Sequence, residues 1–261
     1  MRLPSLFISH GAPTFALEPG RAGPQLTALG ARLPRPRALL VLSPHWRTRG
    51  LTLTGAERPP TIHDFGGFPA PLYALRYPAP GDPALAAEIA ADLTRQGLPA
   101  GIDPARGLDH GTWVPLLHLY PAADIPVLQL SMPYTLDSVD AHALGAALAA
   151  WRARGVLVVG SGSLTHNLSD LRPEPDAVAP YVREFAAWIE RAVRHGDASA
   201  LVDALRRAPH GTRAHPTDEH YLPLPFAAGA AGRWARAEVL DGGFSHGAIS
   251  MHAFVFEAPP P

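Results

Sequence analysis

The chain has 261 residues, of which 47% are hydrophobic, and a formal net charge of −1. It is long and apolar enough for a sizeable core, while the balanced charge argues against nucleic acid or an anionic membrane as a partner. It contains no cysteine, so disulfides, iron–sulfur clusters, thiolate metal sites and a cysteine nucleophile are excluded, and any metal must be bound by His, Asp or Glu.

Short apolar runs that end in turn residues predict the strands. They lie at residues 6–9, 38–43, 125–132 and 155–163. Continuous apolar runs of this length are typical of strands that are buried on both faces of a parallel sheet. Two later runs, at residues 233–241 and 249–257, are expected to form strands that run antiparallel to the rest.

Helical patterns lie between these runs. Residues 82–97 begin with an Asp cap and a proline in the first turn and end at a glycine. Apolar residues recur at helical spacing in 137–155, 177–196 and 197–209. This alternation predicts an α/β fold: a single three-layer domain over residues 1–261, with a mostly parallel central sheet flanked by helices on both faces.

The segment at residues 58–83 is rich in proline and glycine but carries several aromatic side chains, which predicts a long ordered loop. The tail at residues 258–261 is expected to be frayed. The first apolar run is too short for a signal peptide, and no stretch approaches the roughly 20 apolar residues that cross a bilayer. We therefore expect a cytoplasmic protein; its oligomeric state is not predicted.

Three histidines follow predicted strands, namely His10, His45 and His166. Ligands of open α/β sheets bind beyond the carboxyl ends of the strands, and glycine or proline lies next to two of these histidines. Each residue taken alone could be a turn histidine bonded to the backbone. Taken together, they are expected to converge on one crevice and to bind a metal.

The segment at residues 210–230 contains three more histidines, and its HPTDEHYLPL stretch is expected to form a turn followed by a helix. His215 and His220 are five residues apart, so at most one of them is expected to be a ligand, and His220 is preferred because the helical pattern starts there. Glu219 is a rival oxygen ligand, although a solvated side chain is the simpler expectation. His63 and His110 lie in Gly-rich segments without an obvious packing role, so both are candidates for the site.

Seven motifs, taken in this order, resemble the class III extradiol ring-cleavage dioxygenases, and most closely their DOPA-dioxygenase branch. They run from residue 6 to about residue 230 and are LFISHGAP, SPHW, IHDFGGFP, YPAPG, GLDHGTW, THNL and HPTDEHYLPL. The resemblance implies a mononuclear non-haem metal on His10, His45 and His220. It also implies that His166 is an acid/base residue that can be a fourth ligand, and that His110 lies beside the substrate.

The resemblance further implies that Fe(II) and O₂ open the ring of a catechol to a muconic semialdehyde. His166 would remove a hydroxyl proton as general base, and His166 or His110 would return one. His63 and Phe65, from the aromatic loop, would contact the substrate. Many extradiol enzymes use two histidines and one carboxylate, and three imidazoles also suit Zn(II), which is therefore plausible in the isolated protein.

Two other functions remain open from the sequence. One is a zinc hydrolase, in which His166 or Glu219 activates a water towards an amide or ester. The other is a non-enzymatic metal-binding relative with the same fold. The identity of the catechol is open as well, because the width of the pocket depends on loops that the sequence does not place.

Overall fold

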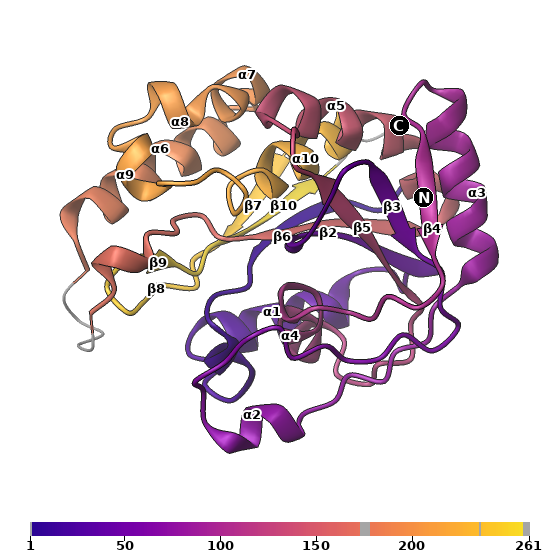
Figure 1. The fold of residues 1–261 in the computed structure, drawn as a ribbon. Helices are drawn as coiled ribbons and strands as arrows, with labels where there is room; N and C mark the ends of the chain where they lie inside the picture. The colour runs from indigo at the N-terminus through magenta and orange to yellow at the C-terminus, as the bar shows by residue number, and fades with distance from the viewer. Residues whose placement is uncertain (1, 173–177, 235, 258–261) are drawn as a thin grey trace.

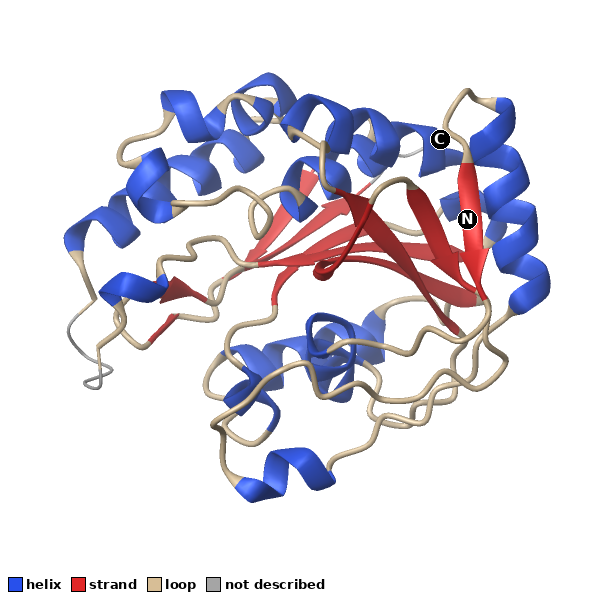
Figure 2. Cartoon of the chain, in the orientation of Figure 1, coloured by secondary structure: helices blue, strands red, loops and turns tan. Residues whose placement is uncertain are grey.

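An eight-stranded sheet forms the middle layer of the molecule, with helices above and below it (Figure 2). The computed structural model describes residues 2–172, 178–234 and 236–257. The sheet order is β4-β3-β5-β2-β6-β1-β10-β7. Its strands are β1 (Ser5–Ser9), β2 (Ala38–Thr48), β3 (Leu51–Thr54), β4 (Ala100–Asp103), β5 (Val127–Pro133), β6 (Val156–Gly162), β7 (Arg236–Leu240) and β10 (Ala253–Glu257).

The four central strands, β5-β2-β6-β1, are parallel to one another, with Leu39 opposite both Val127 and Leu157. Antiparallel pairs join the flanking strands to this core: β3 pairs with β5, and β10 with β1. β7 is antiparallel to β10 and therefore runs in the same direction as β1. The predicted α/β domain with a mostly parallel sheet is confirmed, and β10 runs antiparallel to the core as predicted, whereas the same prediction is wrong for β7. A separate small hairpin consists of β8 (Phe244–Ser245) and β9 (Ile249–Ser250).

Helices cover both faces of the sheet (Figure 1). They are α1 (Ala22–Arg32), α2 (Ala70–Ala74), α3 (Pro83–Arg95), α4 (His110–Leu119), α5 (Ser138–Leu148), α6 (Pro180–Arg194), α7 (Ala198–Val202), α8 (Ala204–Arg207), α9 (Gly211–Ala214) and α10 (Pro223–Ala231), with 3₁₀ turns η1 (Pro13–Ala16), η2 (Ala149–Arg154) and η3 (Leu168–Asp170). No helix among the described residues is both long and apolar enough to cross a membrane.

Alternation along the buried strands builds the two cores. In β1, Leu6 and Ile8 pack with α1 and α4, whereas Phe7 between them packs with α6 and α10 on the other face. Because both neighbours are apolar layers, every residue of β1 is buried. This is why the central strands have continuous apolar sequences rather than a polar–apolar alternation.

The predicted helices are present, with some changes in their bounds. Asp82 caps α3 by accepting a hydrogen bond from the Leu85 amide at 2.9 Å, as the sequence predicts. The pattern at 137–155 forms α5 and then η2, and the pattern at 197–209 divides into α7 and α8. Residue 177 of the expected helix, residue 235 of the expected strand and the tail at 258–261 lie outside the described residues.

Other elements are not evident from the sequence pattern. The strands β3 and β4 have only four residues each, too few for a clear pattern. Helix α4 contains Gly111 and Pro115, which hide it in a segment that resembles a loop. The strand predicted at 38–43 is too short: β2 continues to Thr48, and its register against β5 shifts between Leu42 and Arg47. Pro44 has no N–H to donate, so the ladder is interrupted there and then resumes.

Candidate metal centre

Five histidines from distant parts of the chain meet at the carboxyl ends of the central strands. They are His10 directly after β1, His45 in β2, His110 at the start of α4, His166 after β6, and His220 in the turn before α10. Three of these positions correct the sequence analysis. His45 lies within its strand, inside the stretch over which the register shifts, His110 begins a helix rather than lying in a loop, and His220 precedes the helix instead of lying in its first turn.

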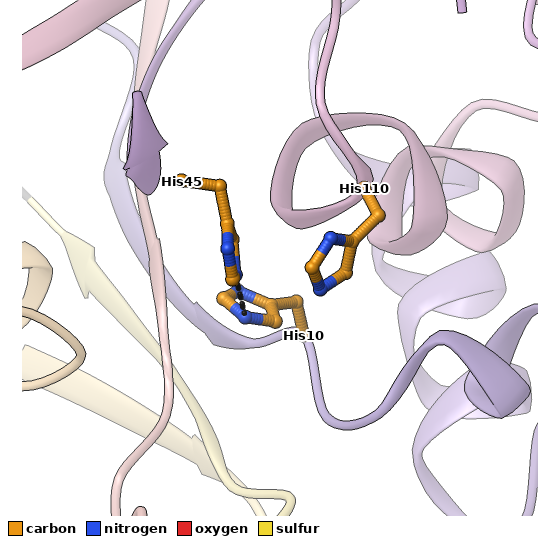
Figure 3. Close-up of side chains that lie close together, drawn as sticks. All are labelled: His10, His45 and His110. Atoms are coloured by element: carbon orange, nitrogen blue, oxygen red, sulfur yellow. Dashed lines mark hydrogen bonds between the residues drawn. The ribbon is translucent and has the colours of Figure 1, made fainter. Parts of the chain in front are cut away.

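The imidazole rings are close enough to share one ion. The ring centroids of His45 lie 5.1 Å from His10, 4.0 Å from His110 and 5.1 Å from His220. Figure 3 shows His10, His45 and His110 pointing towards one another. The ligating atoms of His10, His45 and His110 all lie within 4.8 Å of one another, and so do those of His166, Glu219 and His220.

The partners of the outer ring nitrogens determine which nitrogens face the centre. The Ser161 hydroxyl lies 3.0 Å from Nδ1 of His10 and donates its proton to the Gly111 carbonyl. A hydroxyl has a single proton, so Ser161 accepts from His10, and the proton of His10 is on Nδ1. The Nε2 atom of His10 therefore carries a lone pair, and it lies 3.2 Å from Nε2 of His45.

His220 has the same arrangement, with a carboxylate in place of the hydroxyl. Nδ1 of His220 lies 3.1 Å from the Glu219 carboxylate, which only accepts hydrogen bonds, so the lone pair of His220 is on Nε2. Nδ1 of His45 lies 3.6 Å from the Asp64 carboxylate, too far for a hydrogen bond, although the negative charge there favours a proton on Nδ1. Among the described residues, the buried Nε2 of His220 has no hydrogen-bond partner.

Electrostatics keeps these imidazoles neutral. Burial, followed by the neighbouring histidines, lowers the pKa of His10 and His220 well below the usual value. Burial together with His110 lowers the pKa of His45 to about 3, although Asp64 opposes this. Neutral imidazole is the form that binds metals. Facing lone pairs and an unpartnered buried nitrogen fit a divalent cation in this cluster, and imidazole nitrogens suit iron or zinc. The ligating atoms of His10 and His45 group with that of His110, and that of His220 groups with those of His166 and Glu219.

His110 is held at the same centre by a carboxylate that the sequence analysis missed. Asp64 accepts a hydrogen bond from the His110 amide and another from Nδ1 of its ring, each at 2.9 Å. Burial alone would raise the pKa of Asp64, but the hydrogen bonds and charge of His110 outweigh it and lower the pKa to about 2. The only signal in the sequence was the position of Asp64 next to His63 in HDFGG.

Buried polar groups place His110 and His45 side by side. Asp109 caps α4 by accepting from the Thr112 amide at 3.2 Å, and it also accepts from the Ser43 hydroxyl at 2.8 Å and from Gln129. Burial and the charge of Asp64 raise the pKa of Asp109. This network connects the start of α4, which carries His110, to the irregular part of β2, which carries His45.

Gly111 leaves room for this approach. A Cβ atom on Gly111 would lie 2.5 Å from the Ser43 hydroxyl and 2.9 Å from the His45 ring. Both distances are shorter than van der Waals contact, so only glycine allows the helix to come so near to His45. The glycine that follows His110 in the sequence is therefore part of the site.

His166 differs from the other four histidines. Its ring stacks on that of His220, with centroids 3.5 Å apart and planes 7° from parallel. Burial lowers its pKa, with Glu219 opposing, so it too is neutral. Glu219 accepts from the Thr217 hydroxyl at 2.9 Å as well as from His220, so the expectation of a freely solvated side chain was wrong.

The aromatic loop supplies one wall of the site. The ring of Phe65 lies 5.7 Å from that of His110, nearly perpendicular to it, and also contacts Phe68 and Tyr73. The structure thus brings Phe65 to the cluster. The Nε2 atom of His63 is instead hydrogen-bonded within the loop, 3.1 Å from the carbonyl of Leu75. The centroid of the His63 ring also lies 5.7 Å from that of Phe65.

Comparison with known proteins gives a consistent result. The family model for the catalytic LigB subunit of aromatic ring-opening dioxygenase matches residues 6–257. A 4,5-DOPA dioxygenase extradiol of Beta vulgaris is 40% identical over 256 residues, which cover 97% of this chain and 96% of that one. The protein of the same description from Escherichia coli (strain K12) is 40% identical over 259 residues, which cover 96% and 93%.

A solved structure has the same fold. The crystal structure of an uncharacterized Escherichia coli K12 protein matches with a TM-score of 0.79 and 33% sequence identity. The match covers 98% of this chain and all of that one. The likeness therefore extends over the sheet and both helical layers.

Proposed function

The chain belongs to the family of the catalytic LigB subunit of aromatic ring-opening dioxygenases, and we propose that it is an extradiol dioxygenase acting on DOPA or a related catechol. Enzymes of this family depend on a non-haem metal. The observation that supports the proposal best is the cluster of neutral imidazoles in which Nε2 of His10 lies 3.2 Å from Nε2 of His45 and the buried Nε2 of His220 has no hydrogen-bond partner among the described residues. The product is proposed to be a muconic semialdehyde.

The proposed metal ligands are His10, His45 and His220. Fe(II), the proposed working metal, supplies the one-electron chemistry by which O₂ and a catechol react, whereas Zn(II) fits the same nitrogens but has no accessible redox change. Ser161 and Glu219 support this set by accepting the Nδ1 protons of His10 and His220, because such outer hydrogen bonds orient the ligand rings. The Asp64 carboxylate lies 3.6 Å from Nδ1 of His45.

Two further histidines are proposed to handle protons. His166 is neutral, partly exposed and stacked on His220. It suits removal of a catechol hydroxyl proton as the substrate binds, because a base must be neutral beforehand. His110 has its Nδ1 atom bonded to Asp64, so its Nε2 atom is available to hold or return a proton beside the ring. His166 remains a possible fourth ligand in the proposal.

The substrate ring is proposed to lie against Phe65. This ring borders His110 and continues into the aromatic cluster of Phe68 and Tyr73. An aromatic wall favours a flat apolar ring by stacking or edge contact and excludes water from one side of the centre.

Two further statements stay predictions: that the protein is located in the cytoplasm, and that His63 contacts the substrate.

Oxygen consumption tests the proposal directly. Metal-stripped protein is loaded with Fe(II) or with Zn(II) and given a panel of catechols that includes DOPA, while O₂ uptake and the yellow ring-opened product are followed. We expect O₂ uptake and the yellow product with Fe(II) but not with Zn(II), and no yellow product when O₂ is excluded. No uptake with any catechol, together with ester or amide hydrolysis by the zinc form, would overturn the proposal in favour of a hydrolase.

A further inference from the structure

Asp64 makes more contacts with the histidine cluster than any other carboxylate among the described residues. Its Oδ1 atom accepts from the His110 amide and its Oδ2 atom accepts from the His110 ring, each at 2.9 Å. Oδ2 also lies 3.6 Å from Nδ1 of His45. One carboxylate thus faces the outer nitrogens of two neighbouring rings of the centre.

The backbone around Asp64 is fixed to the helix that carries His110. Thr61 forms a parallel bridge with Leu108, and the Ile62 amide donates to the Leu108 carbonyl at 2.8 Å. The indole N–H of Trp113 donates to the Ile62 carbonyl, also at 2.8 Å. Two residues before Asp64, the loop is therefore attached both to the segment preceding α4 and to the second turn of α4.

This geometry restricts where the proton of His110 can be. Both oxygens of Asp64 only accept, so the Nδ1 atom of His110 must donate, and in the neutral ring Nε2 is therefore left without a proton. If the His110 ring flipped, Nδ1 would move away from Oδ2 of Asp64. This charged oxygen would then lose its hydrogen-bond donor, although the side chain of Asp64 is only 21% exposed. The same carboxylate favours Nδ1–H on His45 through its longer contact.

We propose that Asp64 is a positioning residue that fixes the tautomer and the ring orientation of His110, and secondarily of His45, so that both present a bare Nε2 to the reaction centre. Asp64 does not contact the substrate in this assignment; it acts through the two rings. Its effect on turnover rests on the proposed function, whereas its effect on the tautomer does not.

The nitrogen chemical shifts of the imidazoles test the tautomer directly. Protein labelled with ¹⁵N-histidine is loaded with Zn(II), which is diamagnetic, and studied by long-range ¹H–¹⁵N correlation at about pH 8, where an unperturbed imidazole is neutral. The His110 signals are identified by their loss in His110→Gln. The wild type is expected to show a protonated Nδ1 and a bare Nε2 on His110, and a protonated Nε2 would overturn the proposal without any variant.

The variant Asp64→Asn removes one of the two acceptors while keeping the size of the side chain. Its NH₂ group replaces one of the two oxygens, so the His110 amide and the His110 ring, which lie against different oxygens of Asp64, no longer both have an acceptor in this geometry. The His110 proton is therefore expected to move to Nε2 in a large share of the molecules. The control is Asp137→Asn, because Asp137 caps α5 by accepting from the Asp140 amide at 2.8 Å on the outside of the fold. The control should leave the His110 signals unchanged.

Kinetics separates positioning from a merely structural role. With Fe(II), Asp64→Asn is expected to lower kcat about 10–100-fold, the usual cost of losing a partner of this kind, with little change in KM. Asp137→Asn should keep wild-type kcat. If Asp64→Asn retains both the wild-type tautomer and the wild-type kcat, the proposal is wrong. If the tautomer shifts but even the wild type opens no catechol, the proposed function fails and the role of Asp64 stands.

Discussion

His220 and His215 lie in the same turn-rich segment, and the structure uses them in opposite ways. Both are buried, and burial lowers the pKa of both, to about 4 for His215. Nε2 of His215 donates to the Leu164 carbonyl at 2.9 Å, and its ring packs against Phe185 and Tyr221. Nε2 of His220 is buried without a partner among the described residues and faces three other imidazoles.

The difference teaches that burial and a lowered pKa do not identify a ligand histidine. Each ring also keeps one buried nitrogen without a hydrogen-bond partner among the described residues, Nδ1 of His215 and Nε2 of His220. What distinguishes the two is what surrounds the ring: His215 donates to the backbone and packs against Phe185 and Tyr221, whereas His220 donates to Glu219 and lies among the imidazoles of the centre. The following predictions test this contrast, starting with the largest expected effect.

Removing either histidine should separate the two roles completely. His220→Ala is expected to lose the bound metal and all measurable turnover, because one of three ligand nitrogens disappears. His215→Ala should keep metal and turnover and lose about 1–3 kcal/mol of unfolding free energy, because a core hydrogen bond and ring contacts are removed. Metal content by atomic emission, O₂ uptake and urea unfolding measure these outcomes. Equal metal loss in both variants would contradict the distinction.

His166 extends the contrast from ligand to base. His166→Ala is expected to retain most of the metal and to lower kcat about 100- to 10,000-fold, the range typical of a missing acid/base group. The same measurements apply, with His45→Ala as the comparison that should lose the metal itself. If His166→Ala also releases the metal, His166 is a ligand in the working protein rather than only a base.

The sequence predicts those parts of the site that strands carry. His10 and His166 follow long apolar runs, and the carboxyl ends of parallel strands meet at one edge of a sheet, so the apolar pattern alone predicts that these histidines converge. His45 is predicted for the same reason, although its strand continues past it. The helical pattern favours His220 over His215 as a ligand, and the family resemblance adds the proton role proposed for His110, which periodicity alone does not give.

The outer partners could not be predicted, because they depend on loops. Asp64 reaches His110 only through the pairing of residues 61 and 62 with Leu108, a contact without any periodic signature. Asp109, next to His110, is hidden in the same way, because its role as a cap emerges only when α4 is recognised as a helix. Side chains that orient the ligands are therefore the part of the site that the sequence pattern does not reveal.

Stability as a function of pH gives a finer test of His215. Its pKa is lowered to about 4 in the folded protein, mainly by burial, against about 6.5 when unfolded. Between these values the unfolded chain binds more protons, so the free energy of unfolding rises with pH over this window. Relative to His215→Gln, which does not titrate, the wild type should gain about 3 kcal/mol from pH 4 to pH 6.5. Urea unfolding at several pH values measures this, and parallel curves for the two proteins would show that His215 is not held neutral.

The smallest expected effect comes from adding a single methyl group to Gly111, next to the His45 ring. Gly111→Ala places a Cβ against Ser43 and the His45 ring, so β2 or α4 must shift. We expect a loss of about 1–3 kcal/mol of unfolding free energy, the usual cost of overpacking, and weaker Zn(II) retention against a chelator. Gly66→Ala is the matched control, because a Cβ there meets nothing within 4 Å. If Gly111→Ala lowers the free energy of unfolding but leaves Zn(II) retention unchanged, His45 tolerates displacement. The close approach of α4 would then serve packing rather than the metal centre.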